Sequence, residues 1–129
     1  MSKKLKFSHM NNATMSRIAT IAYALVMVVF GITHFVNTDA MRGFVPAFVP
    51  GGGAWVYITG TALIAAGIAI LINKQARLAG ILLAILLLSF ALTIHLPKVL
   101  SGFNSFVGQI LKDIGLAAGA LLIASRSEK

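Results

Sequence analysis

Four long apolar segments limit what this chain can fold into. Each has 19 residues, close to the roughly 20 that an α-helix needs to cross the hydrocarbon layer of a bilayer. Hydrophobic residues make up 58% of the 129-residue chain and charged residues 11%, and a soluble domain of this length has too little interior to bury that much apolar surface. The sequence therefore predicts an all-α membrane protein, a single domain built as a four-helix transmembrane bundle. The predicted spans are residues 18–36, 54–72, 78–96 and 106–124.

The connections between the segments predict two helical hairpins. The 40–53 stretch contains Pro46, Pro50 and three consecutive glycines, which forbid a continuous helix, so we expect an irregular loop that dips into the membrane interface. Only residues 73–77 join the second span to the third, and so short a link makes the two spans antiparallel. Pro97 is expected to end the third span, because the residue before a proline is pushed out of helical geometry.

The distribution of basic residues predicts the orientation in the membrane. Eight of the 11 Lys and Arg residues lie in the two tails, in the 73–77 loop or just before the first span. In a chain with four spans these regions are all on one side of the membrane. Arg42 and Lys98 lie on the other side. The positive-inside rule then puts both termini in the cytoplasm, with the spans in the inner membrane. The first span imitates a signal peptide, but its apolar run is long and lacks a small-x-small cleavage site, so we interpret it as a retained helix. The eight basic residues are Lys3, Lys4, Lys6, Arg17, Lys74, Arg77, Arg126 and Lys129.

Composition also excludes some functions. The basic clusters stand between long uncharged runs and form no stripe with interleaved aromatics, so the net charge of +8 reflects membrane topology rather than nucleic-acid binding. The chain has no cysteine, and therefore no disulfide, thiolate metal site or thiol redox chemistry of its own. We expect no intrinsic cofactor, and a redox role would depend on a borrowed cofactor such as a quinone, or on a partner.

A weak internal repeat relates the first and third spans. Residues 30–35 read Phe-Gly-Ile-Thr-His-Phe, and residues 90–96 read Phe-Ala-Leu-Thr-Ile-His-Leu. Each segment begins with Phe, followed by a small residue, an aliphatic residue and Thr, and then a His. In the second segment one more residue stands between the Thr and the His. The repeat predicts two parallel hairpins with both histidines at the same membrane face.

Ionisable residues inside the spans are the candidate functional groups, because each costs about 2.5–3.5 kcal/mol to insert. They are His34, His95, Lys112 and Asp113. Lys112 and Asp113 lie about 9–11 Å below the expected outer surface, and the two histidines lie about one turn below it. We therefore predict that the four residues, which come from three helices, form a ligand-binding site without a metal in the outer leaflet.

Each of these groups also has a structural interpretation. A histidine near a helix end commonly keeps its ring at the wet interface, and Lys112 is long enough to reach the headgroups. Asp113 is too short for that, and it points about 100° away from Lys112 on the helix. We expect Asp113 to face the bundle and to meet Gln109, His34 or His95.

Two stripes of small residues, one on the fourth span and one on the third, predict close helix packing. Their members recur at helical spacings, so that each stripe lies on one face of its helix. The stripes consist of Gly108, Lys112, Gly115 and Gly119, and of Gly80, Ala84, Ala91 and His95.

These landmarks resemble the DoxX family of small four-helix membrane proteins, over residues 15–124. Members implied by the resemblance include a subunit of a thiosulfate:quinone oxidoreductase and partners of redox-stress complexes. The missing cysteines argue against direct sulfur handling by this chain. The matching motifs are Gly31-Ile32-Thr33-His34-Phe35, Phe44-Val45-Pro46-Ala47-Phe48-Val49-Pro50, Trp55-Val56-Tyr57-Ile58-Thr59-Gly60 and Arg77-Leu78-Ala79-Gly80.

Three functions stay open, and we favour the first. It is a redox-associated subunit, with a membrane or soluble oxidoreductase partner, in which His34 and His95 bond the carbonyls of a quinone or similar small polar head while Lys112 and Asp113 set charge and protonation. The second is a small transporter or channel, although the inner halves of the spans hold few polar residues. The third is an accessory subunit whose polar groups fix helix register. Haem b between the two histidines is a further geometric alternative.

Overall fold

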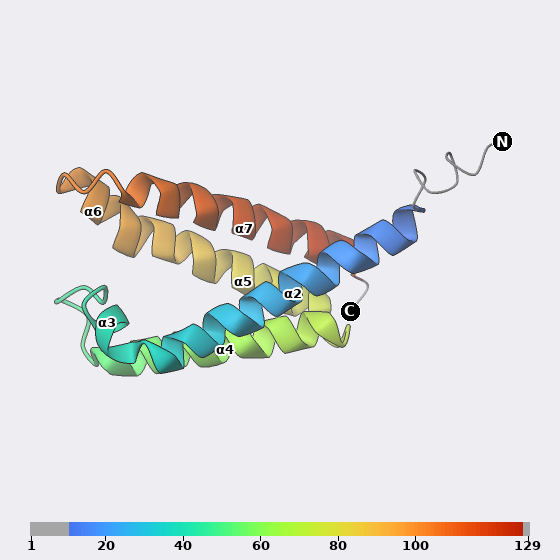
Figure 1. Cartoon of the computed structure of the whole chain (residues 1–129), viewed down its shortest axis with the longest axis horizontal. Coiled ribbons are helices and arrows are strands. Elements are labelled where there is room, and N and C mark those ends of the chain that lie inside the picture. Colours follow the sequence, from blue (N-terminus) through green and yellow to red (C-terminus); the bar gives the residue numbers. More distant parts are fainter. Residues whose placement is uncertain (1–10, 128–129) are drawn as a thin grey trace.

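The computed structural model describes residues 11–127, most of which are helical (Figure 1). Four helices are long and apolar enough to cross a membrane. The prediction of an all-α, multi-pass membrane protein is therefore confirmed for the described residues. The elements are α2 (Asn12–Val36), α3 (Thr38–Arg42), α4 (Gly53–Leu71), α5 (Ala76–Phe90), the π-helix η1 (Ala91–His95), α6 (Leu96–Leu100) and α7 (Phe106–Arg126).

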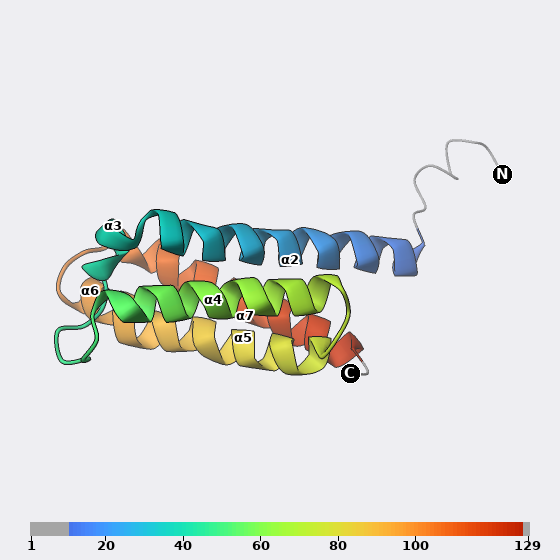
Figure 2. The same ribbon diagram turned by 90° about the horizontal axis from the view of Figure 1, so that it is seen from below.

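The long helices alternate in direction and pack in two pairs. α2 lies against α4, α5 lies against α7, and α4 and α5 join the pairs. In Figures 1 and 2 the short helices α3 and α6 lie at one end of the bundle, and the start of α2 and the end of α7 lie at the other. His34, near the end of α2, and His95, just before α6, are therefore at the same end.

The first helix begins at Asn12 rather than at residue 18. The Asn11 side chain accepts a hydrogen bond from the Thr14 backbone N–H at 2.7 Å, which caps the helix before the apolar run starts. Because α2 has 25 residues and α4 has 19, the first turns of α2 extend beyond α4 (Figure 2). Four of the basic residues used to predict orientation lie outside the described residues, namely Lys3, Lys4, Lys6 and Lys129.

The prediction that Pro97 ends the third span is wrong. The chain stays helical over Ala76–Leu100, through α5, η1 and α6. In η1 the Leu96 N–H bonds to the Ala91 carbonyl, five residues earlier, and this wider turn comes directly before the proline. Pro97 then occupies the first turn of α6, where its missing N–H costs little.

The loop between α2 and α4 is less irregular than predicted, because its first residues form α3. The non-helical part runs over residues 43–52. Gly51 and Gly52 have φ values of 109° and 48°, a region that favours glycine, and they turn the chain into α4. Trp55 Nε1 donates to the Pro50 carbonyl oxygen at 2.5 Å, which fastens the turn to α4.

The backbones of α2 and α4 come close at glycines. A Cβ on Gly60 would lie 2.9 Å from the Gly31 carbonyl oxygen and 2.8 Å from His34 Cβ. A Cβ on Gly67 would lie 2.9 Å from the Ala24 carbonyl oxygen. Any larger residue would therefore push the two helices apart, and His34 would move with them.

Of the two predicted stripes of small residues, the one on α5 brings two helix backbones close together, whereas the one on α7 makes a close contact only at Gly119, where a Cβ would lie 3.0 Å from the Tyr23 ring. A Cβ on Gly80 would lie 2.7 Å from the Ala120 carbonyl oxygen of α7. The stripe predicted on α7 is wrong at Gly108 and Gly115, where a Cβ would meet no atom of the described residues within 4 Å. The buried face of α7 is instead formed by Asp113, Ala117, Ala120 and Ala124.

Candidate functional site

The centre of the candidate site is Asp113, whose side chain is only 1% exposed. It lies on the buried face of α7 and points into the bundle, as expected for an acidic side chain too short to reach the headgroups. Asp113 Oδ2 lies 3.1 Å from Nε2 of His95, the last residue of η1. A carboxylate and an imidazole from two helices thus meet in the interior of the bundle.

Lys112 brings a positive charge to the buried carboxylate. The two residues point about 100° apart on the helix, yet Lys112 Nζ lies 3.6 Å from Asp113 Oδ1 because the long side chain bends toward its neighbour. Nζ also donates to Gln109 Oε1 at 2.9 Å and lies 4.7 Å from the centroid of the Phe30 ring on α2. Gln109, a predicted partner of Asp113, therefore binds Lys112 instead.

The π-helix η1 accounts for the extra residue in the internal repeat. His34 follows Phe30 by four residues, whereas His95 follows Phe90 by five. A π-turn holds one residue more than an α-turn, and η1 lies between Phe90 and His95. The third helix therefore absorbs the additional residue, and the ring of His95 reaches Asp113 on α7.

His34 lies at the corresponding end of α2 but has different contacts. Its Nδ1 lies 2.8 Å from the Phe30 carbonyl oxygen one turn back, which makes Nδ1 a donor, and in the neutral tautomer with this hydrogen bond Nε2 carries the lone pair. Its ring packs edge-on against the Phe30 ring, with 5.4 Å between centroids. The structure thus brings His95, Lys112 and Asp113 together directly and connects His34 to Lys112 through the Phe30 ring.

Two aromatic residues complete the site, and neither was predicted as a site residue. Phe30 lies under the Lys112 ammonium group, and the Phe106 ring lies 5.7 Å from the His95 ring. Phe106 also packs against Phe44 of the loop, with 6.0 Å between centroids. The four-residue spacing of Phe30 and His34 was a usable signal for the first, because such residues share a helix face. For Phe106 the sequence held no such signal.

Two buried atoms of the site, His95 Nδ1 and Asp113 Oδ2, have no hydrogen-bond partner among residues 11–127. The 3.1 Å approach of His95 Nε2 to Asp113 is close, but it is not aligned as a hydrogen bond. Buried polar atoms without partners are uncommon and call for a specific explanation, such as a catalytic or ligand-binding role. An imidazole with a carboxylate beside one ring nitrogen can accept or release a proton at the other nitrogen, which here is Nδ1. The Lys112 ammonium group balances the charge of the carboxylate.

Four apolar helices surround a buried carboxylate, with a mostly buried imidazole and a partly exposed ammonium group beside it, and this arrangement defines a multi-pass membrane protein with an intramembrane polar site. The described residues hold no group of three His, Cys, Asp or Glu side chains that could bind a metal ion. The chain belongs to the family described as "Domain of unknown function (DUF8561)", whose model matches residues 23–125. No curated protein and no solved structure matches the chain.

Proposed function

We propose that this chain is a DoxX-like, redox-associated membrane subunit that binds a quinone or a similar small polar head. The observation that carries the proposal is His95 Nδ1, a buried nitrogen with no partner in residues 11–127 and with Asp113 behind the same ring. The Phe106 ring beside it supplies an aromatic wall against which a flat headgroup can stack. Electrons would pass to or from a partner oxidoreductase, because the chain has no cysteine for thiol redox chemistry.

The proposal assigns His95 Nδ1 as the acceptor for a hydroxyl of the reduced headgroup. A neutral imidazole with its N–H on the Asp113 side has its lone pair on Nδ1. When a partner removes two electrons from the quinol, Nδ1 takes one hydroxyl proton and Asp113 stabilises the imidazolium. His34, with its Nδ1–H on the Phe30 carbonyl, accepts from the second hydroxyl at Nε2 and takes the second proton, so both protons released with the two electrons are accounted for. Since both histidines offer acceptor nitrogens, the site suits the hydroxyls of a quinol better than the carbonyls of a quinone, which the sequence led us to expect as the bound groups.

The transporter and haem alternatives have less support. The half of the bundle away from the site is separated from it by a fully buried apolar layer, formed by Met27, Leu63, Leu83 and Leu87. In that half the hydroxyls of Thr20 and Tyr23 donate to backbone carbonyls rather than forming a pathway. Ser89, two residues beyond Leu87 on the side of the site, does the same. Haem binding between the histidines through their Nε2 atoms is disfavoured, because His95 Nε2 faces Asp113 and the ring would have to turn to free it for the iron.

The proposed orientation places both termini in the cytoplasm and the candidate site in the outer leaflet of the inner membrane. It rests on the eight basic residues expected on one side against two on the other. In this orientation the chain forms two helical hairpins, and Trp55 and Tyr57 lie at the outer interface. The 43–52 segment dips into the same interface with Phe48, which is 84% exposed in the isolated protein.

The orientation predicts that cysteines introduced singly at Asn37 and Ser127 react from opposite sides of the membrane. The natural chain has no cysteine, so each variant carries one thiol. A membrane-impermeant maleimide added to intact cells or spheroplasts should label the Asn37→Cys variant, and the Ser127→Cys variant should react only after the membrane is opened. Labelling of both variants from the same side contradicts the orientation.

Binding of decylubiquinol and decylubiquinone to the protein in nanodiscs tests the function directly. Trp55 is the single tryptophan of the chain, so its fluorescence quenching reports each titration. The His95→Leu substitution is expected to weaken decylubiquinol binding about tenfold or more, because it removes the proposed acceptor. The matched control is Ser89→Val on the same helix, whose hydroxyl donates only to the Ile85 carbonyl. Equal dissociation constants for wild type, His95→Leu and Ser89→Val would rule the proposal out.

A further inference from the structure

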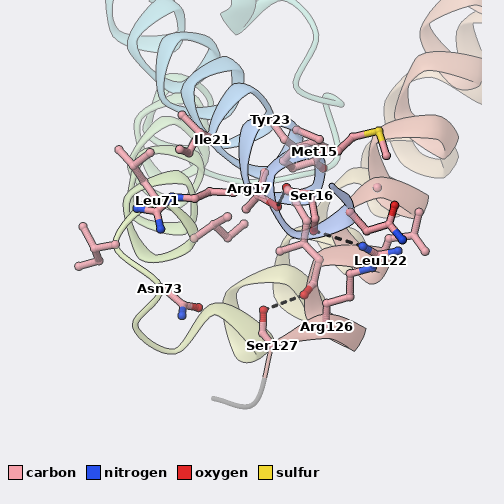
Figure 3. Close-up of a pocket in the computed structure, with 17 residues that line it drawn as sticks. Met15, Ser16, Arg17, Ile21, Tyr23, Leu71, Asn73, Leu122, Arg126 and Ser127 are labelled. Carbon is pink, nitrogen blue, oxygen red and sulfur yellow. Dashed lines mark hydrogen bonds between the residues drawn. The ribbon is translucent and has the colours of Figure 1, made fainter. Parts of the chain in front are cut away.

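A cavity of about 860 Å³ lies at the end of the bundle opposite the candidate site (Figure 3). Its walls come from the first turns of α2, the end of α4 with the following turn, and the last turns of α7. It forms where α2 extends beyond the end of α4 and α7 ends beside it (Figures 1 and 2). Its volume falls within the roughly 300–1,000 Å³ of typical ligand sites.

The mouth of the cavity is basic. Arg17 on α2 and Arg126 on α7 both line it, and both side chains are exposed. Figure 3 shows Arg17 reaching toward Leu71, whereas Arg126 Nη1 donates to Ser16 Oγ at 3.2 Å. Neither arginine forms an ion pair with another residue of 11–127, and the described part of the lining contains no acidic residue. Two arginines from different helices thus line the same cavity.

The deeper part of the cavity is apolar. It is lined by Ile21 and Leu122, each about one helical turn further into the bundle than the arginine on the same helix. The innermost residues of the cavity are Tyr23 on α2 and Gly119 on α7, and the outermost is Asn12. Because Asn12 and Tyr23 are eleven residues apart on α2, the cavity extends roughly 16 Å along that helix. The Tyr23 hydroxyl donates to the Leu116 carbonyl oxygen, which holds the ring across the inner end. The cavity is therefore charged and polar at the mouth and apolar below, like the boundary of a lipid leaflet.

We propose that this cavity binds one anionic phospholipid, with Arg17 and Arg126 on its phosphate and the upper parts of its acyl chains along the apolar wall. Guanidinium groups recognise phosphate oxygens by paired hydrogen bonds. Basic pockets between transmembrane helices suit anionic headgroups, and a free phosphate ion would leave the apolar wall uncovered. This site is separate from the proposed quinone site and does not depend on that function or on the orientation of the chain.

Native mass spectrometry of the full-length protein, in micelles that contain dioleoyl-phosphatidylglycerol or dioleoyl-phosphatidylcholine, tests the proposal. The wild type is expected to retain one phosphatidylglycerol and to bind phosphatidylcholine more weakly. Each arginine removed should weaken retention roughly fivefold, so the double variant Arg17→Gln/Arg126→Gln should lose it by more than about tenfold. The double variant Arg17→Lys/Arg126→Lys should keep part of the affinity, because it keeps the charge without the planar fork.

The matched control is Lys74→Gln/Arg77→Gln, which removes the same charge from the same end of the bundle but outside the cavity. Its retention of phosphatidylglycerol should stay within about twofold of wild type. An equal loss in this control would show attraction to the whole surface, and no loss in the arginine pair would show that the cavity is not involved. Inorganic phosphate that raises the melting temperature as much as phosphatidylglycerol would assign the site to a soluble anion. Each of these three results overturns the proposal.

Discussion

Asp113→Asn is expected to weaken quinol binding about tenfold or more while the bundle stays folded. Asparagine keeps the shape of the side chain and an oxygen near His95 Nε2, but it carries no charge to polarise the neutral imidazole and strengthen Nδ1 as the acceptor for a quinol hydroxyl. Asp113→Leu should weaken binding as much and also lower the free energy of unfolding by about 1–3 kcal/mol, because the buried His95 ring loses its polar neighbour. Titration of both variants with decylubiquinol, followed by unfolding in sodium dodecyl sulfate, measures the two effects.

The pair of substitutions separates a functional Asp113 from one that only fixes helix register. If the carboxylate serves only to align α7 with the third helix, the asparagine variant should bind ligand like wild type and only the leucine variant should be impaired. Lys112→Gln is the companion variant, because it removes the compensating charge 3.6 Å away and leaves the carboxylate in place. Normal quinol binding by both Asp113 variants would refute the site.

Gly60→Ala is expected to destabilise the protein by about 1–3 kcal/mol, because an added methyl overpacks the crossing of α2 and α4. The new Cβ would lie 2.9 Å from the Gly31 carbonyl oxygen, a backbone atom that cannot move without its helix. It would also lie 2.8 Å from His34 Cβ, so the substitution should disturb the candidate site as well. Unfolding in sodium dodecyl sulfate measures the stability, and ligand titration measures the effect on the site.

Gly115→Ala on α7 is the control for this change. A Cβ there would meet no atom of the described residues within 4 Å, and glycine inside a helix is less favourable than alanine. The stability of this variant should be unchanged or higher by up to about 1 kcal/mol. Similar destabilisation by both substitutions would mean that close approach of α2 and α4 is not what Gly60 provides.

Much of the fold could be predicted from the sequence, because hydropathy and length alone decide which segments can cross a bilayer. The four helices and the inward direction of Asp113 follow from the energetic cost of placing backbone and charged groups in lipid. The association of His95 with Asp113 was one of three expected partnerships. The sequence could not choose among them, since the choice depends on how the third helix and α7 rotate against each other.

Three features of this chain depend on three-dimensional context and do not follow from the sequence pattern. Pro97 normally marks a helix end, but the π-turn ahead of it lets the helix continue. The glycines of α7 have helical spacing, yet the buried face of that helix is the one that carries Asp113. The 100° separation of Lys112 and Asp113 is correct for their Cβ atoms, but a long flexible side chain closes the gap.

The π-turn also affects how relatives of this chain should be compared. A helix without the extra residue between Phe90 and His95 would carry the histidine on a different face, about 100° away from Asp113. Such a relative could keep the same residue types, hydropathy and fold and still lack the histidine–carboxylate pair. Within DUF8561 the number of residues in this turn, more than the mere presence of a histidine, therefore indicates which members can form the site. An alignment that closes the one-residue gap would hide that distinction.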